Sequence, residues 1–258
     1  MTGRLFDLDG RVAIVTGAGQ GIGLAIATAL AEYGASVMLT DQNAAVVASA
    51  AADLRARGLD AAATACDVAC RDAVAELVER TRLWGGPTDI AVCNAGIQGP
   101  AGPMRDAGDE DWSRVFDVNL RGAARLADRV LPAMAERGFG RIVLMSSIAG
   151  LRGNGAIGLY GMSKAALAQL ARNLAVEWGP YGICVNAISP GLIRTPLARR
   201  LLADETFMRR RIAATPLRRP GEPHEVAGVA LMLASPAGGF ITGQNIVVDG
   251  GTMISDGS

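Results

Sequence analysis

Two side chains in the segment YGMSK, the phenol of Tyr160 and the ammonium of Lys164, have the types and the spacing needed for proton transfer. Lys164 is the only lysine among 25 lysine and arginine residues, so a general preference for lysine does not explain it. In a helix, this spacing places both side chains on one face, one turn apart. A phenol has a reference pKa of about 10, and a nearby ammonium favours the phenolate. The pair predicts a tyrosine that shuttles protons at neutral pH.

A glycine-rich turn lies near the start of the chain, in VAIVTGAGQGIGLAIATAL. Gly17, Gly19, Gly21 and Gly23 would let the backbone turn tightly and approach a pyrophosphate, which then meets the free amides of the following helix. The spacing is Thr16-Gly17-x-x-x-Gly21-x-Gly23, wider than a strict G-x-G-x-x-G. A flexible connection is the alternative, but the position after the first predicted strand favours a dinucleotide site.

Asp41 ends the second predicted strand, SVMLTD, 20 residues after Gly21. A carboxylate there can accept hydrogen bonds from the adenosine ribose hydroxyls. It also repels a 2′-phosphate, and the neighbouring Gln42, Asn43 and Gln20 supply no cation. The predicted cofactor is therefore NAD, with NADP the less favoured alternative. Asp41 could also be a helix N-cap, and the two roles are compatible.

A bound dinucleotide also explains why position 164 is lysine rather than arginine. A compact ammonium with three rotatable donors can bond a ribose hydroxyl and still lie near the phenol of Tyr160. An oxidised nicotinamide adds a second positive charge, and the two together would have to lower the phenol pKa by ~3 units, or ~4 kcal/mol. The alternative is a lysine left on a solvated helix face by chance.

The composition limits the other functions open to the chain. Half of the 258 residues are hydrophobic, which is enough for a substantial core, and the formal net charge of +0 argues against nucleic acid as a partner. The apolar runs are interrupted well before ~20 residues, which predicts no membrane helix. MTGRLFDLDGR lacks an apolar signal core, so we expect a cytoplasmic protein. The four cysteines form no CxxC motif, and no metal site is predicted.

Short apolar runs alternate with segments of helical period along the whole chain, which predicts an α/β fold with a parallel sheet covered on both faces. No linker or repeat divides it, so residues 1–258 are expected to form a single domain. The predicted strands are 12–15, 36–40, 61–66, 90–93, 141–145, 183–188 and 246–248, and the predicted helices are 21–33, 44–57, 69–84, 111–137, 160–178 and 223–234. The long segment at about 189–220 would form a lid over the ligand crevice.

These segments together resemble the short-chain dehydrogenase/reductase family, from about residue 8 to residue 251. The resemblance is carried by TGAGQGIG at 16–23, Asp41, CDV at 66–68, NAG at 94–96, Asn119 in FDVNL, Ser146 and Ser147, YGMSK at 160–164, and SPGLIRTP at 189–196. Gly161 replaces the commoner small side chain after the tyrosine and leaves the motif intact. The resemblance implies a Rossmann-type doubly wound fold with a seven-stranded parallel sheet, and NAD(P)-dependent alcohol dehydrogenase or reductase activity.

The resemblance also implies a catalytic set of Asn119, Ser147, Tyr160 and Lys164. Tyr160 would be the base in alcohol oxidation and the acid in the reverse direction, and Ser147 would bond the substrate oxygen. Ser146 competes for that role, but the serine of the family precedes its tyrosine by 13 positions, which selects Ser147. Asn119 would hold a water that connects Lys164 to solvent; the alternative is an interior asparagine bonded to backbone.

Cofactor contacts implied by the resemblance run along the phosphates, the adenine, the ribose and the nicotinamide carboxamide. The residues are Gly17, Gln20, Gly21, Ile22, Gly23, Asp41, Asp67, Val68, Asn94, Ala95, Gly96, Tyr160, Lys164, Pro190, Gly191, Ile193 and Thr195. Thr195 and Pro196 also fit an N-cap followed by proline at the first helical position.

The substrate is less clearly indicated. The lid segment carries a group of arginines that could clamp a carboxylate, phosphate or carrier thioester, although solvated faces of amphipathic helices are the favoured interpretation. These arginines are Arg194, Arg199, Arg200, Arg209, Arg210, Arg211, Arg218 and Arg219. Small residues near Tyr160, with Asn154, Ile157 and 97–99, would admit a sugar, polyol or cyclic alcohol.

Three functions remain. The first is an NAD-dependent dehydrogenase of a secondary alcohol, polyol or sugar/ketone substrate. The second is a 3-oxoacyl-thioester reductase, against which Asp41 counts because reductive biosynthesis generally uses NADPH. The third is a non-catalytic dinucleotide-binding regulator, against which the complete catalytic set counts. The resemblance further implies a homotetramer, built through ITGQNIVVDGG and the helices at 111–137 and 160–178, with a dimer as the alternative.

Overall fold

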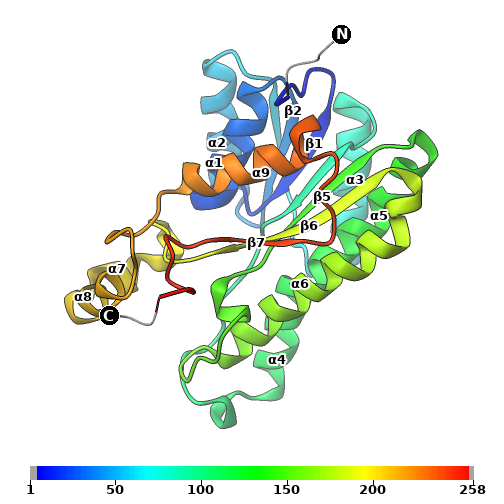
Figure 1. Cartoon of the computed structure of the whole chain (residues 1–258). Helices are drawn as coiled ribbons and strands as arrows, with labels where there is room; N and C mark the ends of the chain where they lie inside the picture. Colours follow the sequence, from blue (N-terminus) through cyan, green and yellow to red (C-terminus); the bar gives the residue numbers. More distant parts are fainter. Residues whose placement is uncertain (1–4, 256–258) are drawn as a thin grey trace.

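A single parallel sheet organises the chain (Figure 1). The computed structural model describes residues 5–255, and the ends of the predicted domain, 1–4 and 256–258, lie outside it. Seven strands pair in the order β3-β2-β1-β4-β5-β6-β7. They are β1 (Val12–Thr16), β2 (Ser36–Asp41), β3 (Ala61–Ala65), β4 (Ile90–Cys93), β5 (Gly140–Met145), β6 (Ile183–Pro190) and β7 (Asn245–Val248). Every predicted strand is confirmed, with ends that move by no more than two residues.

Helices cover both faces of the sheet. The helices α1 (Gly21–Glu32), α2 (Ala44–Ala56) and α9 (Pro223–Ala234) share one hydrophobic core with the sheet. On the opposite face, α3 (Arg71–Gly85), α5 (Gly122–Arg137) and α6 (Gly158–Trp178) share the other. Neighbouring residues of β1 divide between the two, since successive strand side chains point to opposite faces: Val15 joins the first core and Ile14 the second. The predicted doubly wound α/β fold is confirmed.

The helix predicted at 111–137 is interrupted. It consists of α4 (Asp109–Phe116), a π-helical turn at Asp117–Arg121, and α5. The turn contains Asn119, whose side chain bonds the backbone N–H and C=O of Ile97, in the loop after β4. A wider turn admits an extra residue and redirects the side chains within it, a feature often found at functional sites. The interruption therefore fixes Asn119 against the loop that follows β4.

The segment after β6 contains the short helices η5 (Pro196–Ala198), α7 (Arg199–Ala203) and α8 (Glu205–Ala213). Its base is closed by backbone bonds from Arg194 N to Gly221 O (2.9 Å) and from Gly221 N to Leu192 O (2.9 Å). Figure 1 shows α7 and α8 projecting to one side of the sheet, near the last described turn of the chain. A bond from Leu217 N to Gly250 O (3.2 Å) links the segment to that turn.

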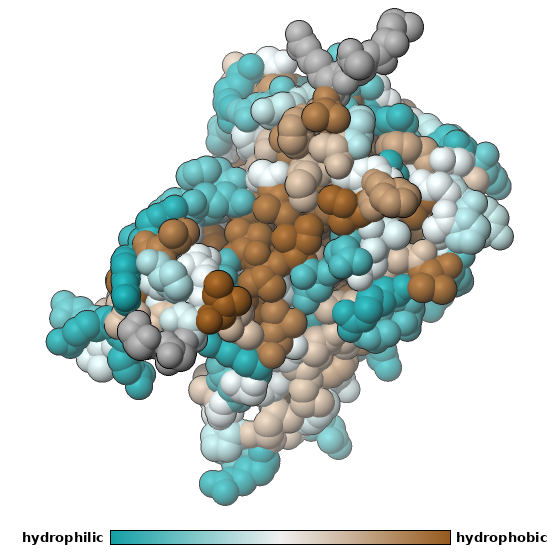
Figure 2. Space-filling model, in the orientation of Figure 1, coloured by the Kyte–Doolittle hydropathy of each residue, from teal (hydrophilic) through white to brown (hydrophobic). Residues whose placement is uncertain are grey.

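One face of the molecule is notably apolar. Figure 2 shows hydrophobic residues gathered over β7, the edge strand of the sheet. Val247 of β7 is 40% exposed, and Ile254, just after it, is 90% exposed.

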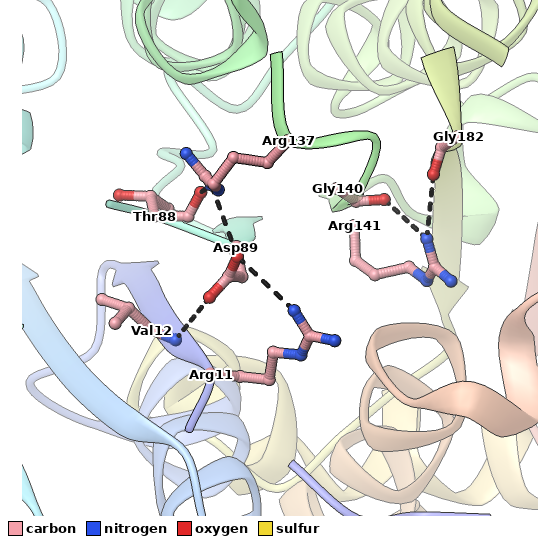
Figure 3. Close-up of polar contacts among 8 residues, drawn as sticks. All are labelled: Arg11, Val12, Thr88, Asp89, Arg137, Gly140, Arg141 and Gly182. Atoms are coloured by element: carbon pink, nitrogen blue, oxygen red, sulfur yellow. Dashed lines mark hydrogen bonds and ion pairs between the residues drawn. The ribbon is translucent and has the colours of Figure 1, made fainter. Parts of the chain in front are cut away.

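A charged network ties the amino ends of the strands together (Figure 3). The carboxylate of Asp89 accepts a bond from Val12 N (3.1 Å) and lies near the guanidinium groups of Arg137 (3.3 Å) and Arg11 (3.8 Å). Asp89 is only 7% exposed. The loop before β4 is thereby joined to β1 and to the end of α5, at the opposite edge of the sheet from the carboxyl ends.

None of the helices in residues 5–255 combines the length and the hydropathy required to cross a membrane. In the same part of the chain, no three His, Cys, Asp or Glu side chains gather in an arrangement that could hold a metal ion. All four cysteines are free thiols.

Candidate active site

Two connected cavities lie at the carboxyl edge of the sheet, where the strand order reverses between β1 and β4. In sheets of this kind, ligands bind at such a reversal. The larger cavity measures about 670 Å³ and the smaller about 190 Å³. Both are lined by Ile22, Asn94, Gly96, Thr195 and Leu197, so they open into one another.

The glycine turn at the floor of the larger cavity has the geometry that a pyrophosphate needs. Gly17 and Gly21 have φ angles of +63° and +60°, which side-chain-bearing residues rarely adopt. A Cβ on Gly23 would lie 2.2 Å from Gly17 O and 2.5 Å from the Asn94 Nδ2. Gln20, which precedes α1, makes no side-chain cap, so the first amides of the helix are left for a ligand. The turn therefore fits the diphosphate of a dinucleotide.

Asp41 lies at the end of β2 and lines the larger cavity. Its Oδ1 accepts a bond from Asn43 N (3.0 Å), and a Cβ on Gly19 would lie 3.2 Å from its Oδ2. The N-cap of α2 is Asn43, whose Oδ1 accepts from Val46 N (3.2 Å). Asp41 is therefore not the cap, and its carboxylate stands beside the glycine turn. One arginine, Arg114 of α4, lines the same cavity.

Asn94 joins the end of β4 to the glycine turn by bonds that the sequence analysis did not anticipate. Its Nδ2 donates to Thr16 O (2.9 Å) and to Gly17 O (3.0 Å). The Thr16 Oγ1 in turn accepts from Asn94 N and Ala95 N, both at 3.0 Å. This amide side chain therefore fastens the end of β4 to the glycine turn, in addition to lining both cavities.

The smaller cavity brings together Ser147, Tyr160 and Lys164. Ser147 follows β5, and the other two residues lie on the first turns of α6. The Ser147 Oγ accepts from Ala149 N (3.1 Å), and the Ser147 hydroxyl acts on the Tyr160 phenol in the direction that lowers its pKa. The Lys164 Nζ donates to Met145 O (2.7 Å) and lies 5.5 Å from the centroid of the Tyr160 ring. The first turns of α6 and the segment after β5 together place a phenol, an ammonium and a hydroxyl in one cavity.

Burial dominates the acid–base properties of this group. Desolvation lowers the pKa of Lys164 to about 8. Desolvation also raises the pKa of the Tyr160 phenol, and the Ser147 hydroxyl lowers it in part. In the protein alone, Tyr160 therefore favours the neutral phenol over the phenolate. Activation of Tyr160 by Lys164 and by the charge of a nicotinamide stays a prediction.

Two further polar residues, Ser146 and Asn119, make hydrogen bonds to the first turns of α6, which carry Tyr160 and Lys164. The Ser146 Oγ donates to Lys164 O (2.7 Å), which anchors α6 to the end of β5. The Asn119 Nδ2 donates to Ile97 O (2.9 Å) and to the Ser163 Oγ (2.9 Å). Asn119 is 1% exposed and is not part of either cavity wall, so its observed partners are those of an interior asparagine. Its predicted role through a water stays a prediction.

Nearly all of the expected cofactor contacts reach the two cavities. Gly23 does not line them, because it packs against Gly17 O instead. The residues that do are Gly17, Gln20, Gly21, Ile22, Asp41, Asp67, Val68, Asn94, Ala95, Gly96, Tyr160, Lys164, Pro190, Gly191, Ile193 and Thr195. Thr195 also caps η5, accepting from Ala198 N (3.3 Å) ahead of Pro196, as its sequence predicts.

Beyond Tyr160, the smaller cavity is lined by residues from the three segments that follow β4, β5 and β6. Polar and charged side chains come from Gln98, Arg152, Asn154 and Arg211, and apolar ones from Ile148, Ile157, Leu192, Leu201 and Phe207. The sequence analysis included Asn154 and Ile157 but missed Arg152. An arginine five residues after Ser147, in a loop without acidic residues, was the available signal.

With this geometry in place, the chain can be compared with known proteins. A family profile described as enoyl-(acyl carrier protein) reductase matches residues 17–253. The gluconate 5-dehydrogenase of Gluconobacter oxydans is 38% identical over 251 residues, 97% of this chain and 98% of that protein.

Solved structures agree with this comparison. A gluconate 5-dehydrogenase from Burkholderia cenocepacia, in complex with NADP and tartrate, is 35% identical; the match covers 97% of this chain and 98% of that chain, with a TM-score of 0.93. A 7α-hydroxysteroid dehydrogenase, complexed with NADH and 7-oxo glycochenodeoxycholic acid, is 36% identical over 96% of each chain, with a TM-score of 0.92. The chain belongs to the short-chain dehydrogenase/reductase family. It is an oxidoreductase of the class that acts on alcohols, sugars and ketones.

Proposed function

We propose that this protein is an NAD-preferring dehydrogenase that oxidises a secondary alcohol, polyol or sugar to a ketone, and catalyses the reverse reduction. One observation carries the proposal. Ser147, Tyr160 and Lys164 share a cavity that opens into the cleft beside the glycine turn, so a bound alcohol and a dinucleotide can meet there.

A bound oxidised nicotinamide would supply the hydride acceptor for the alcohol carbon. Ser147 bonds the substrate oxygen and positions it beside the phenol of Tyr160. Tyr160, as phenolate, takes the hydroxyl proton in oxidation and returns it in reduction. Lys164, held on Met145 O, places a positive charge near the Tyr160 ring that favours the phenolate. Asn119 fixes the loop after β4 and, in this proposal, holds a water that connects Lys164 to solvent.

Asp41 supports the preference for NAD. Its carboxylate adjoins the glycine turn, where it can accept bonds from ribose hydroxyls and repel a 2′-phosphate. Two observations favour NADP instead: Arg114 lines the same cavity, and the gluconate 5-dehydrogenase from Burkholderia cenocepacia binds NADP. Comparing kcat/KM for the two cofactors decides between them.

The cofactor test uses Asp41→Ala with Asp53→Ala as its control, because Asp53 lies on the exposed face of α2. Loss of a charged hydrogen bond should reduce the kcat/KM ratio of NAD to NADP by ~10-fold or more in Asp41→Ala. The control should keep the wild-type ratio. A wild-type preference for NADP contradicts this part of the proposal.

The substrate class is tested by a screen of polyols, sugars, cyclic alcohols and 3-hydroxyacyl thioesters, followed by the absorbance of the reduced nicotinamide. The relative from Gluconobacter oxydans, named for gluconate, supports the polyol class. Turnover of the thioesters in preference to the others would favour the 3-oxoacyl-thioester alternative. Absence of any turnover with either dinucleotide would favour a non-catalytic regulator.

We also propose a homotetramer. The apolar face over the edge strand β7 and the exposed Val176 of α6 (81% exposed) support two separate self-association surfaces. Val247→Arg and Val176→Arg should each reduce the mass measured by light scattering from tetramer to dimer. Leu83→Arg, at an exposed position of α3, is the control and should leave the mass unchanged.

Two further parts of the proposal concern the lid and the location. The segment at about 189–220 would act as a lid on the single domain, since Leu197, Leu201 and Phe207 of this segment line the smaller cavity. The free thiols support a cytoplasmic location, because cytosolic proteins are kept reduced.

A further inference from the structure

The smaller cavity carries more positive charge than the proposed reaction needs. Besides Lys164, its lining includes the exposed Arg152 and the half-buried Arg211, and none of the described residues that line it is an aspartate or glutamate. Arg152 lies in the loop after β5, and Arg211 lies on α8. Two segments far apart in the sequence therefore bring arginines to the wall that faces Ser147 and Tyr160.

Neither arginine is neutralised by another side chain within residues 5–255. The ion pairs found there include neither residue. The charge of Asp249 raises the pKa of Arg211, but no ion pair joins the two side chains. The two carboxylate oxygens of Asp249 instead accept hydrogen bonds from Gly251 N (2.8 Å) and Met253 N (2.7 Å). Arg211 is half-buried, and a charge removed from water without a partner is costly. The cavity wall thus holds no carboxylate, and the charge of Asp249 acts on Arg211 from outside the wall without forming an ion pair.

The position of Arg211 is set by its own helix. Its guanidinium carbon lies 5.5 Å from the ring centroid of Phe207, one turn earlier on α8, and both side chains line the cavity. Stacking on an aromatic ring orients a guanidinium while leaving its edge free to donate. Burial, and then the charge of Arg152, lower the pKa of Arg211, which indicates that the two cations are close enough to repel each other. An anion between them would relieve that repulsion.

The other arginines of the segment are excluded by their contacts or their positions. Arg194 pairs with Glu222 (3.0 Å), and Arg219 pairs with Glu225 (2.6 Å). The Arg218 side chain bonds Ala213 O. Four more are exposed and do not line the cavity: Arg199, Arg200, Arg209 and Arg210. Arg211 is therefore the arginine of this segment that faces the reacting group.

We propose that Arg152 and Arg211 bind the carboxylate of a hydroxy-acid substrate, while its secondary alcohol lies against Ser147 and Tyr160. This inference rests on the proposed dehydrogenase function and narrows its substrate class. A carboxylate matches the planar donor edge of a guanidinium and can be shared between two of them. The Nδ2 of Asn154, whose Oδ1 is occupied by Ala156 N and Ile157 N, remains available to donate to a hydroxyl between the two ends.

The first test compares acids with matched neutral alcohols. Short aldonates such as D-gluconate differ from alditols such as D-glucitol only in the terminal carboxylate. In the presence of the preferred dinucleotide, we expect kcat/KM for at least one aldonate to exceed that of its alditol by ~10-fold or more. A wild-type enzyme that prefers the alditols, or a phosphorylated alditol, overturns the inference.

The second test replaces each arginine by an uncharged, unbranched side chain. Arg211→Met and Arg152→Met should each lower kcat/KM for the aldonate by ~10-fold to ~100-fold, mainly through KM, and should lower kcat/KM for the alditol much less. Arg210→Met is the matched control, because Arg210 is the neighbouring residue of α8, is exposed, and does not line the cavity. Equal effects of Arg211→Met on the acid and the alcohol overturn the carboxylate assignment.

Failure of this inference can be told apart from failure of the proposed function. If alditols are oxidised and acids are not preferred, the dehydrogenase function stands and the carboxylate site falls. If nothing is oxidised, calorimetry of D-gluconate binding to the protein–dinucleotide complex decides. Binding that is lost in Arg211→Met and retained in Arg210→Met supports the anion site, and absent or unchanged binding contradicts it.

Discussion

The ammonium of Lys164 lies 5.5 Å from the centroid of the Tyr160 ring, one turn further along α6, and is anchored on Met145 O at the end of β5. The anchor matters because α6 and β5 come from different parts of the fold. Ser146 adds a second bond between them, to Lys164 O. The position of the charge relative to the phenol is therefore set by the sheet as well as by helical spacing.

The single lysine can be observed directly. Burial lowers the pKa of Lys164 to about 8. Lysine labelled with ¹³C should give one side-chain NMR signal whose titration midpoint lies near pH 8 in the folded protein. In denaturant the same signal should titrate near the reference value of about 10.4. A midpoint near 10 in the folded protein would show that Lys164 is solvated rather than buried.

The same shift predicts how stability depends on pH. Because the folded pKa lies below the unfolded value, the unfolded state binds more protons between about pH 8 and pH 10.5, and this group makes the free energy of unfolding rise with pH in that range. Tyr160 acts in the opposite sense, since its pKa is raised and its contribution is lost above about pH 10. Denaturant unfolding of the wild type and of Lys164→Met at several pH values measures the contribution of Lys164. A slope that is unchanged in the variant contradicts the shift.

Tyr160→Phe should lower kcat by ~100-fold to ~10,000-fold, because it removes the proton acceptor while retaining the ring. The Kd for the dinucleotide, measured by fluorescence titration, should change little. Ser146→Ala provides a comparison: it breaks the bond to Lys164 O and should reduce stability more than it reduces the chemical step. Survival of activity in Tyr160→Phe would refute the proton-shuttle role.

Strands such as β1, β4 and β5 were predictable because each contains a short, mostly apolar run, as expected for a sheet buried on both faces. The interruption at Asn119 was not, since it depends on bonds to Ile97, 22 residues earlier, that only the folded chain brings within reach. A π-turn shifts the apolar pattern of a helix only slightly, so the turn cannot be recognised from one sequence.

The candidate site also contains residues that the sequence reveals and residues that only the folded chain brings together. Tyr160 and Lys164 lie one turn apart in one helix, so their spacing reveals the pair. The role of Asn94 as a clip on the glycine turn depends on Thr16, which lies 78 positions earlier. Arg152 and Arg211 reach the same cavity only because α8 folds back over it, and no local pattern indicates which lid arginine does so.

Gly23→Ala should destabilise the protein and weaken dinucleotide binding. Its Cβ would lie 2.2 Å from Gly17 O, so the glycine turn or α1 must move. We expect a loss of ~1–3 kcal/mol in unfolding free energy, as for other overpacked sites. Gly228→Ala is the control, because that helical glycine of α9 has no atom within 4 Å of its Cβ position, and the change should stabilise the protein by ~0.5–1 kcal/mol. Equal Tm values for the two variants would contradict the packing argument.

Asp89→Ala should be among the more destabilising single changes at the amino edge of the sheet. Val12 N would lose its acceptor, and Arg137, also bonded to Thr88 O, would lose its nearby carboxylate. The loss of these contacts costs ~1–3 kcal/mol, mainly because the buried Val12 N is left without its acceptor, while Arg11 and Arg137 stay partly in water. Denaturant unfolding measures this cost, with Glu79→Ala in the exposed pair with Arg82 as a control that should change little. Since the network lies at the edge away from both cavities, kcat/KM of folded Asp89→Ala should match the wild type. A loss of activity without a loss of stability would mean that the amino edge is coupled to the site.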